Sequence, residues 1–135
     1  MPTNSPYVID LWANHKLKVI VMAVLKYDHR KRLLDVTVWR APGRRAGSSN
    51  PRAFQAVHDA YRKEIWDAAQ KAHIPKINHQ IRLSAQFINP ETPDLDNLIV
   101  ALFRALDGKT GDESMALLGD DGQIVGLKDV DIWFQ

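Results

Sequence analysis

The chain has 135 residues, a length typical of one domain that can bury a core of its own. Hydrophobic residues make up 45% of it and charged residues 25%, as in water-soluble globular proteins. It contains no cysteine, which excludes disulfides, thiolate nucleophiles and cysteine-ligated zinc. The longest apolar run, residues 19–25, is too short to span a bilayer, so we expect no membrane span. No basic segment followed by an apolar stretch and a small-residue cleavage site opens the sequence, so we expect no secretion signal either.

The formal net charge of +2 conceals an uneven distribution of charge along the chain. Residues 1–80 hold 14 Lys and Arg against 6 Asp and Glu, whereas residues 81–135 hold 4 against 10. A basic half suits a polyanionic partner and an acidic half suits cations, although solvated surface is the alternative for both.

The first third of the chain predicts a β-hairpin that follows a short arm. Residues 1–16 show little periodicity, so we expect a loose arm or a short edge strand there. Residues 17–27 are rich in Val and Ile, and residues 33–40 alternate apolar and polar side chains. Both patterns are typical of strands, and the polar residues 28–31 would turn the chain between them.

Residues 40–52 form a predicted loop, since Gly, Pro and Ser interrupt regular structure there. The loop contains no acid and four cations, Arg40, Arg44, Arg45 and Arg52. Arginine binds phosphate through paired hydrogen bonds, so these four residues are our candidate DNA-binding group. A solvated linker is the alternative.

Two helices and two further strands follow this loop. Asn50 and Pro51 favour a helix start, and apolar residues at three- and four-residue steps extend that helix to about His73. The remaining chain predicts a strand over 80–88, a helix from Asp94 that Gly108 ends, a polar excursion over 108–119 and a strand over 124–134.

The predicted order β-β-α-β-α-β indicates a single α+β (mixed α/β) domain that spans residues 1–135. We expect one sheet of about four strands with the two main helices packed on one of its faces.

Four acidic residues in two short clusters are the most informative feature of the sequence. Asp94 and Asp96 open the second helix, and Asp120 and Asp121 precede the final strand. If that strand lies beside the strand ending near Ile88, both clusters share one end of the sheet and could hold a divalent cation. Judged by spacing alone, helix capping and turn formation explain these acids slightly better than a metal site does.

Three sets of residues form a combined motif: Pro-Asp-Leu-Asp-Asn-Leu at 93–98, Ala-Leu at 101–102 and again at 105–106, and Asp-Asp-Gly-Gln-Ile-Val at 120–125. This motif resembles the RusA family of Holliday junction resolvases. The resemblance covers about residues 78–130. It implies a RusA-like fold and a homodimeric, Mg²⁺-dependent endodeoxyribonuclease, with Mn²⁺ able to substitute, that cuts four-way or branched DNA in paired strands. It also implies a cytoplasmic location in bacteria or a phage-encoded protein.

By this resemblance the catalytic, metal-binding residues are Asp94, Asp96 and Asp121, with Asp120 as an outer partner. The chain departs from the family at three points. Val100 stands where the family usually has a catalytic Lys, Arg104 stands where an acid is common, and residues 108–118 contain an insertion. The candidate replacements for the missing cation are Arg104, Lys109 and Lys128, although Arg104 also reads as a solvent-facing helix residue.

Val100 keeps a second class of function open, a catalytically weak or inactive dimer that binds DNA junctions. A metal-dependent nuclease for flaps or RNA is a third.

Overall fold

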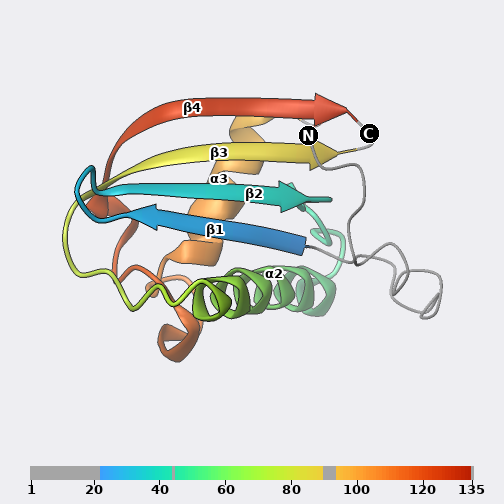
Figure 1. The fold of residues 1–135 in the computed structure, drawn as a ribbon. Helices are drawn as coiled ribbons and strands as arrows, with labels where there is room; N and C mark the ends of the chain where they lie inside the picture. The colour runs from blue at the N-terminus through green and yellow to red at the C-terminus, as the bar shows by residue number, and fades with distance from the viewer. Residues whose placement is uncertain (1–21, 44, 90–93, 135) are drawn as a thin grey trace.

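The computed structural model describes residues 22–43, 45–89 and 94–134. They form one four-stranded sheet with two α-helices, which confirms the predicted α+β class and element order (Figure 1). The elements are β1 (Met22–Asp28), β2 (Leu33–Trp39), α2 (Pro51–Lys71), β3 (Ile81–Asn89), α3 (Leu95–Leu106), the 3-10 turns η1 (Glu113–Met115) and η2 (Asp121–Gln123), and β4 (Ile124–Phe134). The predicted arm over 1–16 and one loop cation, Arg44, lie outside the described residues.

The predicted hairpin is confirmed. β1 and β2 pair antiparallel, from Met22 opposite Trp39 to Asp28 opposite Leu33. The Asp28 carboxylate holds the turn by accepting hydrogen bonds from the backbone N–H of Arg30 at 3.0 Å and of Lys31 at 3.1 Å. Such a side-chain-to-backbone turn is a common use of Asp.

Helix α2 begins where its sequence signals predict. The Asn50 side chain accepts from the N–H of Arg52 at 2.9 Å and of Ala53 at 3.4 Å, and Pro51 occupies the first helical position. The loop before it turns through Gly47 at φ +77°. A Cβ at Gly47 would lie 2.8 Å from the backbone of Ala53, so the close approach of loop and helix also requires glycine.

Both helices cover the same face of the sheet (Figure 1). Alternate residues of the strands, such as Val36, Leu83 and Phe87, pack in one cluster with Ile65 of α2 and Leu102 of α3. Among the described residues, neither helix combines the length and the apolar character that a membrane crossing requires.

The direction of β4 decides where the acidic clusters lie. β2, β3 and β4 are neighbours and run parallel to one another, with Ile81 opposite Ile124 and Asn89 opposite Phe134. We call the edge where these three strands begin the N-terminal end of the sheet, and the edge where they finish the C-terminal end. Helix α3 connects β3 to β4 and returns the chain from the C-terminal end to the N-terminal end.

The segment 108–119, predicted to be a polar excursion, is partly a core element. Ala116, Leu117 and Leu118 are buried. The backbone N–H of Ile77 donates to the carbonyl of Leu117 at 2.9 Å, and Leu118 donates to Leu106 at 2.9 Å. These bonds attach the segment to the end of α3 and to the residues that follow α2.

Candidate metal centre

The expected meeting of the two acidic clusters at one end of the sheet is wrong for a single chain. The final strand does lie beside β3, as expected, but it is parallel to β3, so its beginning lies opposite Ile81 and not opposite Ile88. Asp94 precedes the 12-residue helix α3 and Asp107 follows it, and a helix of that length extends about 18 Å. Asp94 and Asp96 therefore lie at the opposite end of α3 from Asp120 and Asp121.

A different set of carboxylates meets at the N-terminal end of the sheet. One oxygen each from Asp107, Asp120 and Asp121 lies within 4.8 Å of the others, so the three residues could hold a metal ion. Asp107 is buried, Asp120 is partly exposed and Asp121 is exposed. Three acids of graded exposure form a cluster that is anchored in the core and open to solvent.

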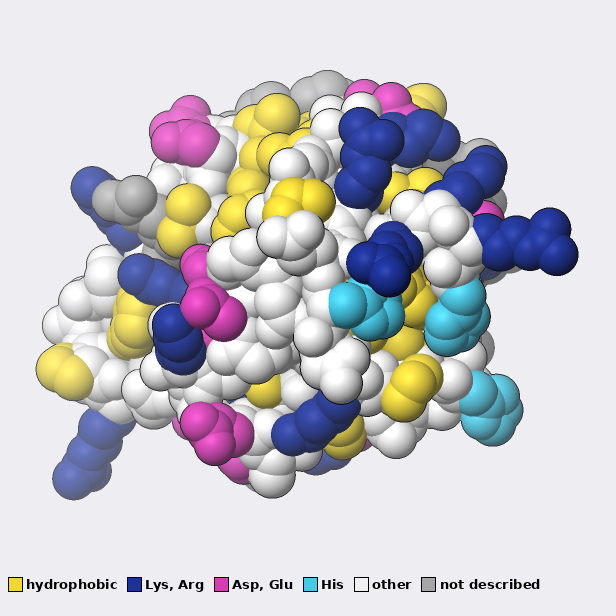
Figure 2. Space-filling view, turned by 90° about the vertical axis from the view of Figure 1, so that its left-hand side faces the viewer, with side chains coloured by type: hydrophobic (Ala, Val, Ile, Leu, Met, Phe, Trp, Pro, Cys, Tyr) yellow, Lys and Arg dark blue, Asp and Glu magenta, His cyan; other side chains and the backbone are white. Residues whose placement is uncertain are grey.

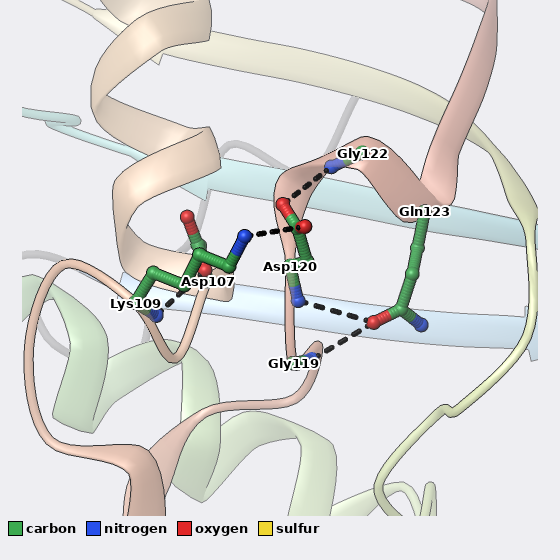
Figure 3. A network of polar contacts seen from close by, with 6 residues as sticks. All are labelled: Asp107, Lys109, Gly119, Asp120, Gly122 and Gln123. Atoms are coloured by element: carbon green, nitrogen blue, oxygen red, sulfur yellow. Dashed lines mark hydrogen bonds and ion pairs between the residues drawn. The ribbon is translucent and has the colours of Figure 1, made fainter.

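A compact turn holds Asp120 in place (Figure 3), and Asp121 is the next residue, at the start of η2. The Asp120 carboxylate accepts from the N–H of Gly122 at 3.0 Å, and the Gln123 side-chain oxygen accepts from the N–H of Asp120 at 3.1 Å. This reciprocal arrangement is a capping box at the start of η2. The same Gln123 oxygen accepts from the N–H of Gly119 at 2.9 Å. The turn therefore fixes the Asp120 carboxylate and the backbone position of Asp121 immediately before β4.

A buried arginine of α2 holds the third acid. The Arg62 guanidinium donates to the carbonyl oxygen of Asp107, to that of Arg104 at 2.6 Å and to the Thr110 hydroxyl at 3.1 Å. An acid beside a helix C-terminus is electrostatically unfavourable, and a cation that binds the last carbonyls offsets this. Arg62 thus fixes the end of α3 from which Asp107 extends.

Neighbouring groups shift the pKa values of Asp120 and Asp121 in opposite directions. Hydrogen bonds from the Gly122 N–H and from Lys109 hold the pKa of Asp120 below its usual value. Although Asp121 is exposed, some loss of hydration, followed by the negative charges of Asp107 and Asp120, raises its pKa. A divalent cation would relieve this repulsion, because it favours the ionised form of each acid.

A hard cation would draw these three oxygens closer together. In an octahedral Mg²⁺ shell, adjacent oxygens lie about 3 Å apart and opposed oxygens about 4 Å apart, whereas the three oxygens here lie within 4.8 Å of one another. Lys109 Nζ lies 2.7 Å from an Asp120 oxygen, but both side chains are largely exposed, at 66% and 44%. Such exposed ion pairs contribute little, so a metal ion could displace Lys109 at small cost.

The other predicted site residues lie at the C-terminal end of the sheet. Asp94 and Asp96 are exposed, and Asp94 makes no capping hydrogen bond with its side chain. Arg40 immediately follows β2, and its N–H donates to the Ile88 carbonyl at 2.9 Å. Arg45 and Arg52 are exposed in the loop and the first turn of α2. The described members of the basic loop therefore share an end of the sheet with Asp94 and Asp96.

Of the three candidate replacement cations, the structure brings Lys109 to the carboxylates. Arg104 is half-buried, with its guanidinium 5.7 Å from the centre of the Phe54 ring, so it is not a simple solvent-facing residue. Lys128 is exposed on β4. Val100 is half-buried in the middle of α3.

Sequence reasoning missed Asp107. It lies between Leu106, the last residue of α3, and Gly108, which the sequence marks as the end of the helix. The usable signal was weak, because an acid at a helix C-terminus is unfavourable, but Arg104 in the last turn and Lys109 just beyond it partly offset that effect. Its burial depends on Arg62, which lies 45 residues away along the chain.

A second basic surface was also missed. Arg30, Lys31 and Arg32 are exposed at the tip of the β1–β2 hairpin, and the Arg32 carbonyl accepts from the N–H of Arg82 at 2.8 Å. This tip lies at the N-terminal end of the sheet. Figure 2 views that end and shows Lys and Arg side chains gathered on it beside exposed His and acidic side chains.

Comparison of the chain with protein-family models, curated proteins and solved structures found no match.

Proposed function

We propose that this chain is a Mg²⁺-dependent endonuclease that cuts four-way DNA junctions as a homodimer. The observation that carries the proposal is the meeting of Asp107, Asp120 and Asp121, with oxygens within 4.8 Å of one another, on a backbone fixed by Arg62 and Gln123. The choice of DNA junctions rests on the resemblance of residues 93–125 to the RusA motifs, and Mg²⁺ on the all-oxygen donor set.

A bound Mg²⁺, or Mn²⁺ in its place, would supply an activated water and offset the negative charge that develops during phosphodiester hydrolysis. The protein residues hold the ion and the strand. Asp107 and Asp121 would offer oxygens to the ion. Lys109, once released from Asp120, would lie close enough to meet a phosphate oxygen. The exposed cations at the hairpin tip would bind backbone phosphates further along the strand.

A homodimer would give Asp94 and Asp96 a place in the same site. Within the described residues, β4 has a neighbour on one side only, so its outer edge is free to pair. Three of its side chains are large, apolar and well exposed, Val125 at 56%, Leu127 at 43% and Trp133 at 47%. A long apolar edge strand of this kind tends to pair with another strand.

Antiparallel pairing of β4 with its copy about a two-fold axis would place opposite ends of the two sheets together. Asp121 of one chain would then lie at the end where α3 of the partner begins, beside the partner's Asp94 and Asp96. The basic loop that contains Arg40, Arg45 and Arg52 would face the same site. Two equivalent sites related by an axis also suit symmetric cuts.

The first experiment incubates the full chain with a labelled four-way junction in Mg²⁺ and in EDTA. We expect paired, Mg²⁺-dependent cuts. Asp107→Asn and Asp121→Asn should abolish cutting and keep junction binding, because the phosphate-binding cations are unchanged. Asp67→Asn is the matched control, since Asp67 is an exposed acid on α2 that pairs only with Lys63 in the described structure. Normal cutting by both Asp107→Asn and Asp121→Asn would refute the assignment.

Val100 and the separation of the acidic clusters within one chain favour a second candidate, a dimer that binds junctions without cutting them. A junction that is shifted but intact in Mg²⁺ and Mn²⁺ would support this second function. Preferential cutting of flaps or RNA would show that the site is a nuclease with another substrate.

A further inference from the structure

A cavity of about 390 Å³ lies between the segment that follows α2 and the segment that follows α3. Ile77, Leu117 and Leu118 are among its lining residues, and their side chains are almost fully buried beneath it. Lys76 and Asn78 line it from the exposed side. Its volume is within the range of small-molecule sites, and a mixture of apolar and polar lining residues is typical of them.

Gln123 forms a wall of the cavity and connects it to the metal centre. Its side-chain nitrogen donates to the carbonyls of Ile77 at 2.8 Å and His79 at 3.0 Å. Its side-chain oxygen accepts from Gly119 and Asp120 (Figure 3). An amide has two donor hydrogens and room for two acceptor bonds, so all its capacity is used. The cavity and the acidic turn are therefore held together as one unit.

The polar groups of the rim suit a flat heterocycle. Asn78 is exposed, and its side chain makes no hydrogen bond to any other described residue, so its amide offers both donors and an acceptor. Lys76 Nζ donates to the Glu113 carbonyl at 2.7 Å and lies 5.9 Å from the centre of the Trp66 ring, which orients the ammonium at the rim. An apolar surface for the ring face and an amide for the ring edge are the groups by which proteins bind an unstacked base.

We propose that this cavity binds a nucleobase of the DNA strand whose phosphate lies at Asp107, Asp120 and Asp121. The proposal rests on the proposed function, because a phosphate at the carboxylates places its own nucleoside on one side of the turn 119–123 or the other. The cavity occupies one of those sides. A base at a branch point is the easiest to receive, because it has already lost part of its stacking and pairing.

The test is a titration of the ¹⁵N-labelled full chain, followed by backbone amide chemical shifts. Three probes are compared: 2′-deoxyadenosine, its 5′-monophosphate with Mg²⁺, and inorganic phosphate with Mg²⁺. We expect both adenine compounds to shift the amides of Ile77, Leu117 and Gly119, and inorganic phosphate to leave Ile77 and Leu117 unshifted. Asn78→Ala should weaken deoxyadenosine binding about fivefold through the lost hydrogen bonds. Gln80→Ala is the matched control, an exposed amide in the same segment that does not line the cavity.

Unshifted Ile77 and Leu117 amides at millimolar deoxyadenosine would overturn the proposal, as would equal affinity of Asn78→Ala and the parent chain. Asp121→Asn should keep deoxyadenosine binding, and its loss would place the probe at the metal centre and refute a separate base site. Because deoxyadenosine has no phosphate and needs no metal, its binding is read independently of DNA cutting. Failure of Mg²⁺-dependent cutting with intact deoxyadenosine binding would therefore refute the nuclease alone.

Discussion

Two inactive variants should restore activity to each other when their chains are mixed. Asp96→Asn alters the C-terminal end of the sheet, and Asp121→Asn alters the N-terminal end. In the proposed homodimer each site combines Asp121 of one chain with Asp96 of its partner. Each variant alone lacks a carboxylate in both sites, so we expect its cutting rate to fall about a hundredfold or more.

The size of the recovery follows from counting sites. Random association of equal amounts of the two variants gives about half mixed dimers, and about one quarter of the parent number of sites is then intact. In each mixed dimer one site carries both changes and the other carries neither. The assay unfolds the two variants together in urea, refolds them, and measures single nicks in a labelled junction.

Three outcomes distinguish a site shared between two chains from a site formed within one chain. Recovery to about a quarter of the parent rate supports a site shared between chains. Absence of recovery, when both single variants are inactive, would refute the sharing, because a site made within one chain stays broken in every mixed dimer. Full activity of Asp96→Asn alone would remove Asp96 from the site and leave the carboxylates at the N-terminal end as the whole centre.

Three further predictions concern stability and DNA binding. Arg62→Ala should lower the free energy of unfolding in urea by about 2–4 kcal/mol, because three acceptors at the end of α3 lose their donor. Burial raises the pKa of Glu64, so the folded chain holds this proton more tightly than the unfolded chain. The contribution of Glu64 to stability should therefore fall as the pH rises above about 4, and Glu64→Gln should stabilise the fold by less than about 1 kcal/mol at pH 7 only. Replacing Arg40, Arg45 and Arg52 by Ala should reduce the salt slope of junction binding by about 0.9 per lost phosphate contact.

The first of these predictions has a matched control, and each of the other two has an outcome that would contradict it. Arg52→Ala changes an exposed cation and should alter stability by no more than about 0.5 kcal/mol, so an equal loss in both variants would contradict the role of Arg62. A stabilising effect of Glu64→Gln that persists at pH 3 would show that the pKa of Glu64 is not its cause. An unchanged salt slope would show that the basic loop does not contact DNA.

Local signals predicted most of the fold. The caps at Asn50 and Pro51 and the alternation of residues 124–134 located α2 and β4 well, because each depends on neighbours in the sequence. The direction of β4 relative to β3 depends on how the chain connects the two strands. A helix between two neighbouring strands makes a crossover, which yields parallel strands, whereas antiparallel neighbours are joined by a hairpin. The helix at 95–106 therefore already contained the information that separates Asp96 from Asp121.

The candidate site could be predicted only in part. Asp120 and Asp121 were found because two adjacent acids at a strand start form a visible motif. Asp107 joins them through contacts between distant segments, chiefly Arg62 on α2 and the pairing of Leu118 with the end of α3. Such contacts leave no periodic pattern, so neither the burial of Asp107 nor the cavity beside Gln123 could be derived from spacing.

Helix α3 sets both the distance and the relative rotation between the acids at its two ends. Removing one residue would shorten it by about 1.5 Å and rotate Asp94 and Asp96 by about 100° relative to Asp107. Adding seven residues would keep the orientation nearly constant and move the clusters apart by about 10 Å. In a shared site, the distance between the two cut positions on DNA would change with the length of this helix.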